Sequence, residues 1–146
     1  MANLESAIAM AVKALTGQTD KAGEPYILHP LRVMFSLSSN NERIVGVLHD
    51  VVEDTELSFD DLRKMGFSEA VVDALKAVTK LPEEEGSDEG YLAFVKRAGA
   101  NPIARQVKIA DLLDNLDVTR LDEVNEKSAR RISKYLRALR YLEGLN

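Results

Sequence analysis

Apolar residues recur at spacings of three and four positions along this chain, and that periodicity limits the possible folds more than any other feature. It places Leu4, Ile8, Ala11 and Leu15 on one face of a first helix. We find no segment that alternates apolar and polar residues, as a half-buried strand would. We therefore expect an all-α fold, a single-domain helical bundle of seven or so helices that takes in residues 1–146.

The same periodicity, together with turn residues, predicts the other helices. One begins just after His29, because Pro30 suits a first helical turn and favours an extended conformation for the residue before it. A central helix over residues 44–52 is apolar on nearly every side, which is typical of a helix inside a bundle. Further helices are expected over residues 58–66, 68–78, 88–95, 102–116 and 125–142, with the acidic stretch 82–90 as a solvated loop.

Composition argues against several classes of function. There are 24 acidic and 19 basic residues, and the net charge of −5 argues against a protein that coats DNA or anionic membranes. The chain has no cysteine and therefore no disulfide, thiolate zinc site or cysteine nucleophile. No apolar run approaches the ~20 residues of a membrane span, so we expect a soluble, cytoplasmic protein.

A basic run near the carboxyl end allows a second interpretation. It could be an RNA-binding stripe, but one solvated basic helix face on an acidic protein is the commoner case, so nucleic acid is not the partner we expect. The run consists of Lys127, Arg130, Arg131, Lys134, Arg137 and Arg140.

The first chemical feature is a group of four polar residues within the apolar segment 44–52 and just after it. His49 and Glu53 are four positions apart, as are Asp50 and Asp54, so on a helix they form one compact patch. Carboxylates at the carboxyl end of a helix face an unfavourable dipole. A divalent cation would neutralise them and would also use the imidazole. The alternative, that these are surface charges at a helix end, stays open on these residues alone.

Two further positions are weaker candidates. Asp111 lies in VKIADLLDN, where Lys108 and Asn115 share its helix face, and a simple Lys–Asp surface pair would explain it equally well. His29 precedes a proline, where a capping or core histidine is more common than a metal ligand.

Three segments taken together, GQTDKAGEPYILHP, VLHDVVEDT and VKIADLLDN, occur in this order. They resemble the HD-domain metal-dependent phosphohydrolases, most closely the hydrolase domain of the RelA/SpoT alarmone enzymes and the small alarmone hydrolases. The resemblance implies that one divalent metal ion, usually manganese, is held by His29, His49, Asp50 and Asp111. It also implies that Glu53 and Asp54 act on the attacking water and the leaving group. The substrate-binding residues implied in the same way are Lys21, Asn115, Arg131 and Tyr135.

The chain departs from the family pattern at three positions. Relatives often have a histidine at the place of Leu15 and a charged residue at the place of Leu112. A basic residue often precedes the loop lysine, where this chain has Asp20. That change removes one positive contact and bears on nucleobase preference and affinity.

The expected function is metal-dependent hydrolysis of the 3′-pyrophosphate of a guanosine or adenosine polyphosphate alarmone, (p)ppGpp-like, with release of pyrophosphate. Two imidazoles and two carboxylates suit manganese or iron before zinc. The alternatives are an HD phosphohydrolase for another nucleotide or phosphoester, and a non-catalytic nucleotide-binding domain. Intact Glu53 and Asp54 weigh against mere binding, which has no need of them. The sequence is compatible with an oligomer.

Overall fold

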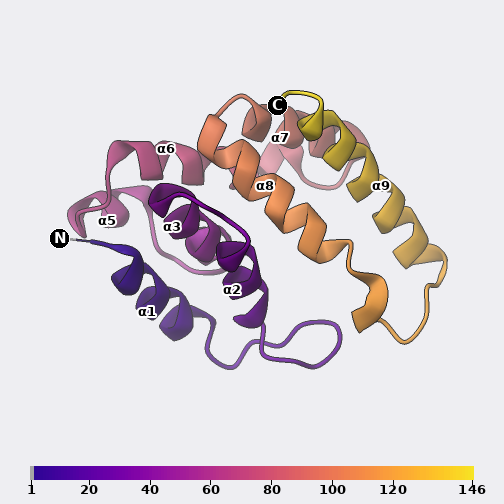
Figure 1. Cartoon of the computed structure of the whole chain (residues 1–146), viewed down its shortest axis with the longest axis horizontal. Helices are drawn as coiled ribbons and strands as arrows, with labels where there is room; N and C mark the ends of the chain where they lie inside the picture. Colours follow the sequence, from indigo (N-terminus) through magenta and orange to yellow (C-terminus); the bar gives the residue numbers. More distant parts are fainter. Residues whose placement is uncertain (1) are drawn as a thin grey trace.

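The computed structural model describes residues 2–146, and their architecture is entirely helical (Figure 1). This confirms the predicted all-α bundle, although the described residues form nine α-helices rather than seven or so, with two short 3-10 helices. The elements are α1 (Leu4–Leu15), α2 (Leu28–Phe35), α3 (Asn40–Leu48), α4 (Val51–Asp54), α5 (Phe59–Lys64), α6 (Glu69–Ala77), η1 (Pro82–Glu84), α7 (Asp88–Gly99), α8 (Pro102–Asn115), η2 (Val118–Arg120) and α9 (Glu126–Glu143).

Local capping explains where several helices begin. Asn3 accepts a hydrogen bond from the backbone N–H of Ser6 before α1, and Asn125 does the same with Ser128 before α9. In both cases the serine hydroxyl accepts in return from the backbone of the asparagine. Such caps satisfy N–H groups that have no partner inside the helix and contribute about 1 kcal/mol each.

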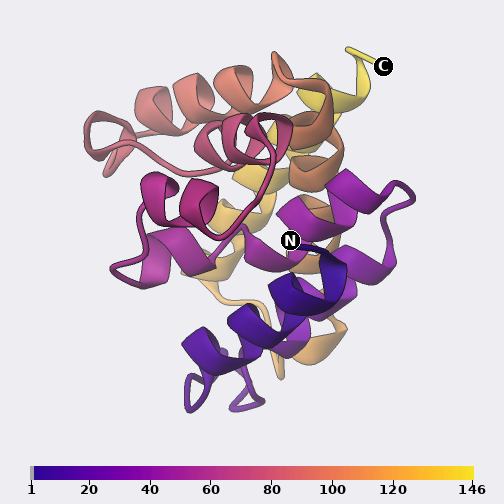
Figure 2. The ribbon, with the colours of Figure 1, turned by 90° about the vertical axis from the view of Figure 1, so that its left-hand side faces the viewer.

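Helix α3 is the centre of the bundle and packs against α1, α2, α6 and α8. Its residues Val45, Val47 and Leu48 are fully buried. Leu15 and Leu112, at two of the positions that depart from the family pattern, are also core residues. A second apolar cluster joins α7, α8 and α9. Figure 2 shows the carboxyl terminus at the opposite end of the molecule from the loop that follows α1.

The predicted central helix over residues 44–52 is wrong in one respect, because it is interrupted. Helix α3 ends at Leu48, His49 and Asp50 form a turn, and α4 begins at Val51. The His49 imidazole Nδ1 lies 2.5 Å from the carbonyl oxygen of Gly46, an acceptor that an unbroken helix would use for the N–H of Asp50. The His-Asp pair therefore lies at a break between two helices.

Two other local predictions are wrong. His29 is not extended but lies in the first turn of α2, where its N–H donates to the carbonyl oxygen of Tyr26. The stretch 82–90 is not simply a solvated loop, because η1 forms there and Glu84 is buried. The reason for that burial is Arg97, whose guanidinium pairs with the Glu84 carboxylate at 2.7 Å.

Among residues 2–146, no helix combines the length and the apolar character needed to cross a membrane.

Candidate active site

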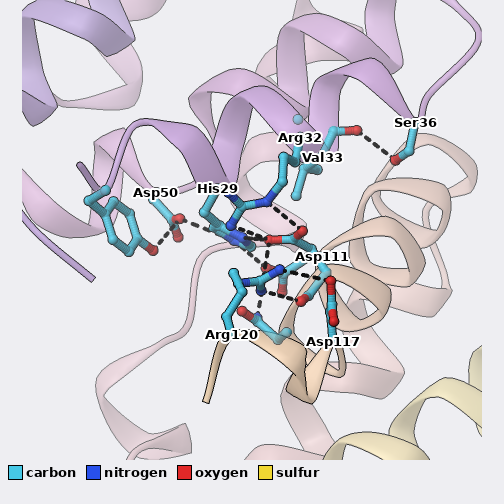
Figure 3. A network of polar contacts seen from close by, with 12 residues as sticks. His29, Arg32, Val33, Ser36, Asp50, Asp111, Asp117 and Arg120 are labelled. Atoms are coloured by element: carbon cyan, nitrogen blue, oxygen red, sulfur yellow. Dashed lines mark hydrogen bonds and ion pairs between the residues drawn. The ribbon is translucent and has the colours of Figure 1, made fainter. Parts of the chain in front are cut away.

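Four side chains predicted as metal ligands meet at one point of the bundle, and we call them the His/Asp cluster. His29 comes from α2, His49 and Asp50 from the break after α3, and Asp111 from α8. The Nε2 atom of His29 lies 2.9 Å from Oδ1 of Asp111 and 3.8 Å from Oδ2 of Asp50. The Nε2 atom of His49 lies 3.3 Å from each of the same two oxygens. Figure 3 shows His29 with Asp50 on one side and Asp111 on the other.

A hydrogen bond at Nδ1 orients each of the two imidazoles. Nδ1 of His29 is 2.6 Å from Oδ2 of Asp114, and Nδ1 of His49 is 2.5 Å from the carbonyl oxygen of Gly46. Because a carbonyl or an ionised carboxylate only accepts hydrogen bonds, each Nδ1 carries a proton and donates it. The Nε2 atoms are thereby left to face Asp50 and Asp111, and Nε2 of His49 is buried without a hydrogen-bond partner among the described residues.

The two imidazoles and the two carboxylates of the cluster alter one another's charge states. Burial favours a neutral ring for His49, but the negative charges of Asp50 and Asp111 outweigh it and raise the pKa of His49 to about 10. Burial likewise opposes ionisation of Asp111, yet Lys108 and the two imidazoles hold the pKa of this carboxyl well below its usual range. The Asp111 carboxylate is thus stabilised as an anion by the positive charges beside it.

The cluster fits a single divalent cation. Two atoms bound to one ion at ~2.0–2.3 Å lie at most ~4.6 Å apart, and the separations measured here, 2.9–3.8 Å, are all shorter. His29, His49 and Asp111 each offer a ligand atom within 4.8 Å of the others. The orphaned Nε2 of His49 and the set of two nitrogens and two carboxylates suit a first-row transition metal.

A surrounding layer of residues holds the cluster, and the sequence did not single most of them out. The Tyr26 hydroxyl donates to Oδ2 of Asp50 at 2.7 Å. Asp114 accepts from His29 and also from Arg32, whose Nε is 2.7 Å away. Figure 3 shows Arg32 beside His29 in this layer. A signal was present, since Asp114 follows Asp111 by three positions and Arg32 follows His29 by three, which places each pair on one helix face.

The Lys108 side chain is largely buried beside Asp111 rather than being part of a surface pair. Its Nζ atom lies 2.8 Å from Oδ2 of Asp111, and the two side chains are 12% and 9% exposed. The open alternative from the sequence, a solvated Lys–Asp pair, therefore does not describe Asp111.

Glu53 and Asp54 lie in the short helix α4, next to the cluster in the chain. Oε1 of Glu53 accepts the backbone N–H of Lys80 at 2.8 Å. Both residues are exposed, but partial desolvation of their carboxyls, and then the negative charge of Asp50, raise the pKa of each above its ordinary value, although the Lys80 N–H opposes the shift at Glu53. A carboxyl with a raised pKa is better matched to proton transfer near neutral pH.

A cavity of about 470 Å³ opens beside the cluster, and we call it the first cavity. Its size lies within the range of small-molecule sites. His29 of the cluster forms part of its wall. All four residues expected to bind substrate line it: Lys21, Asn115, Arg131 and Tyr135.

The first cavity is lined by more basic than acidic side chains, with Lys21, Arg32, Arg120 and Arg131 against Asp20 and Asp117. Partial burial, followed by repulsion from Arg131 and Lys127, lowers the pKa of Lys21, so these cations are close enough to oppose one another. Asn115 reaches toward the cluster, since its Nδ2 donates to Oδ1 of Asp111 at 3.2 Å. An anion in this cavity would relieve the repulsion.

Asp20 has a structural role in the loop that carries Lys21. Its Oδ1 atom accepts the backbone N–H groups of Ala22 at 2.9 Å and Glu24 at 3.0 Å. The aspartate therefore closes the loop on itself, and Asp20 also lines the first cavity. Its effect on nucleobase preference stays a prediction.

Comparison with known proteins identifies the family. No family model matches the chain. It is 33% identical over 153 residues to a GTP pyrophosphokinase of Streptomyces coelicolor, an alignment that covers 98% of the chain and 18% of that protein. It is 32% identical over 124 residues to a guanosine-3′,5′-bis(diphosphate) 3′-pyrophosphohydrolase of Aquifex aeolicus, covering 80% and 17%. This chain belongs to the HD-type domain family of the RelA/SpoT enzymes.

The RelA/SpoT likeness extends to structure. A solved structure of a metazoan ortholog of SpoT, described as hydrolysing ppGpp, superposes with a TM-score of 0.83 at 24% identity and covers 100% of this chain and 88% of that one. This likeness shows the shared fold. The bifunctional (p)ppGpp synthase/hydrolase SpoT of Escherichia coli is 28% identical over 141 residues, covering 90% of the chain. The chain spans about a fifth of the length of these curated relatives.

Proposed function

We propose that this RelA/SpoT-type domain hydrolyses the 3′-diphosphate of guanosine or adenosine 3′,5′-polyphosphates and releases pyrophosphate, with manganese as the working metal. The observation that carries the proposal is the first cavity, whose basic wall meets the His/Asp cluster at His29. Two of the relatives are named for the same 3′-pyrophosphohydrolase reaction or for (p)ppGpp hydrolysis.

The residues of the first cavity suit a nucleotide. The Arg131 guanidinium can hold a phosphate with two hydrogen bonds, and Lys21 adds a second positive charge. The aromatic ring of Tyr135 offers a face for stacking or a hydroxyl for hydrogen bonding. A nucleotide bound this way would carry its 3′-phosphoryl group toward His29.

His29, His49, Asp50 and Asp111 would hold the metal ion. When bound, such an ion lowers the pKa of water and neutralises charge on the phosphoryl group. Glu53 and Asp54, with their raised pKa values, are the groups that exchange protons. One carboxylate takes a proton from the attacking water while the other, protonated, gives one to the departing 3′ oxygen. A bond forms between water oxygen and phosphorus, and the bond between the 3′ oxygen and phosphorus breaks.

The test is a panel of nucleotides. We expect manganese-loaded protein to release pyrophosphate from guanosine 3′,5′-bis(diphosphate) and from its adenosine counterpart, leaving the corresponding 5′-nucleotide. Chelation should abolish the reaction. Guanosine 5′-triphosphate should be a poor substrate, because its phosphates extend from the ribose 5′ side. Cleavage of ordinary 5′-nucleotides or other phosphoesters without any 3′-diphosphate would contradict the proposal and leave only a broader HD phosphohydrolase.

A further inference from the structure

A second cavity, of about 370 Å³, has no part in the function proposed so far. It is lined by Lys80, Tyr91, Lys134 and the segment 84–88. Two of these residues are connected to the active site. The backbone N–H of Lys80 donates to Glu53 at 2.8 Å, and the ring of Tyr91 lies near Lys108, which pairs with Asp111.

The second cavity is also a neighbour of the first. The rings of Tyr91 and Tyr135 have centroids 6.1 Å apart, and Tyr135 lines the first cavity. The two cavities are therefore separated by aromatic side chains of α7 and α9.

Three lysines converge on Tyr91. The Nζ atoms of Lys134, Lys80 and Lys108 lie 4.5, 5.6 and 5.9 Å from the centre of its ring. Nζ of Lys108 is already paired with Asp111, whereas Lys134 has no ion-pair partner among residues 2–146. Lys134 therefore brings a positive charge without an ion-pair partner to the wall of the cavity, whereas Lys80 lies 3.9 Å from Glu85.

The Tyr91 hydroxyl is the most telling feature of the second cavity. The residue is only 8% exposed, and its hydroxyl is buried with no hydrogen-bond partner within the described residues. A buried hydroxyl without a partner is destabilising, and native structures rarely contain one unless a water or ligand completes it. Lys80 and Lys134 lie over the ring of the same tyrosine and line the same cavity, so an anionic acceptor would suit both the hydroxyl and the two ammonium groups.

The acidic residues of this wall do not oppose an anion equally. Glu84 is neutralised by the guanidinium of Arg97 at 2.7 Å. Glu85 is exposed, and its carboxylate lies 3.9 Å from Nζ of Lys80. Asp88 is exposed at the first position of α7, whose amino-terminal end carries positive partial charge. The acids at the solvent side are screened by water, whereas Tyr91 is buried.

We propose that the second cavity is a diphosphate subsite. It holds the distal phosphate of the 3′-diphosphate before cleavage and the released pyrophosphate afterwards, with the Tyr91 hydroxyl and the Lys80 and Lys134 ammonium groups as donors. The role in turnover rests on the proposed function, but the binding of pyrophosphate does not. No covalent bond changes in this subsite.

The test is equilibrium dialysis of labelled inorganic pyrophosphate against the full chain, with manganese and separately with chelator. Tyr91→Phe removes only the hydroxyl, which has no protein partner to lose, so the fold is kept. We expect Tyr91→Phe and Lys134→Gln each to weaken pyrophosphate binding about tenfold, as for the loss of one hydrogen bond to a charged group. Guanosine 5′-diphosphate binding should be unchanged.

Arg137→Gln is the matched control, since it removes one positive charge from the same helix at an exposed position outside both cavities. It should bind pyrophosphate as the wild type does. Equal affinity in the wild type, Tyr91→Phe and Lys134→Gln would overturn the subsite, as would a wild type that binds no pyrophosphate in either condition. If the variants weaken pyrophosphate binding as expected but the protein cleaves no 3′-diphosphate, the proposed function is overturned and the subsite is not.

Discussion

Arg97 on α7 connects three parts of the fold through one side chain. Its guanidinium donates to the carbonyl oxygens of Lys76 at 2.7 Å and Thr79 at 2.8 Å. It also pairs with both oxygens of Glu84, at 2.7 and 3.2 Å, and that carboxylate is 7% exposed. The residue after Thr79 is Lys80, which holds Glu53 in place. Replacing Arg97 therefore changes both stability and the active site.

The loss of stability expected in Arg97→Ala can be estimated from the contacts that Glu84 keeps without the guanidinium. Glu84 keeps only the hydrogen bond from the backbone N–H of Leu81, at 2.8 Å. Breaking a buried ion pair by removing one partner costs ~3–5 kcal/mol. Because the Arg97 side chain is 31% exposed, water replaces part of what is lost, and we expect a fall of ~2–4 kcal/mol in the free energy of unfolding. For a chain of this size that lowers the melting temperature by about 5–15 °C.

Arg63→Ala is the matched control. The Arg63 side chain is 34% exposed, a fraction similar to the 31% of Arg97. Its partners Asp60 and Glu69, however, are 76% and 65% exposed. Exposed pairs contribute about 1 kcal/mol or less. In urea unfolding, Arg97→Ala should lose at least ~1 kcal/mol more unfolding free energy than Arg63→Ala. Equal losses in the two variants would refute the reasoning. Below its melting temperature, Arg97→Ala should also turn over substrate more slowly, because the Lys80 N–H no longer fixes Glu53.

Three further outcomes are expected. Glu53→Gln should lower turnover ~10²-fold or more at unchanged metal content, and a variant that is inactive only because it has lost metal would contradict the role. Arg131→Ala should weaken nucleotide binding about tenfold or more in a titration, with metal content unaffected. Although burial opposes its charge, hydrogen bonds from Arg32 and His29 hold the pKa of Asp114 below its usual 3.8. Its folded pKa is thus depressed, so it contributes stability above about pH 4 that is lost as pH falls further. In Asp114→Asn the free energy of unfolding should fall less steeply as the pH decreases below about 4. The same slope in the variant and the wild type would contradict this role of Asp114.

Much of the helical fold could be predicted because local patterns determine it. The helix expected from Leu4 to Leu15 is α1, and the capping residues Asn3 and Asn125 lie just before helices whose apolar periodicity is regular. The interruption at His49 could not be predicted in the same way. It depends on the imidazole taking the Gly46 carbonyl and on Tyr26 bonding to Asp50 from 24 positions away.

The candidate site, too, could be predicted only in part from the sequence. The motifs identified the residues that form the His/Asp cluster, but not the contacts that orient them. Asp114 is hydrogen-bonded to His29, which is 85 positions away in the sequence. Glu84 is buried because it pairs with Arg97, which follows it by 13 positions. Periodicity reports which residues share a helix face, whereas these pairs depend on how separate helices pack.

The most direct measurement of the central claim is the fate of water oxygen. Manganese-loaded protein would hydrolyse guanosine 3′,5′-bis(diphosphate) in ¹⁸O-labelled water, and mass spectrometry would locate the label. Because water attacks the phosphorus next to the 3′ oxygen, we predict one labelled oxygen in the released pyrophosphate and none in the nucleotide. Label in the nucleotide, or no release of pyrophosphate from either the guanosine or the adenosine compound, would contradict the account.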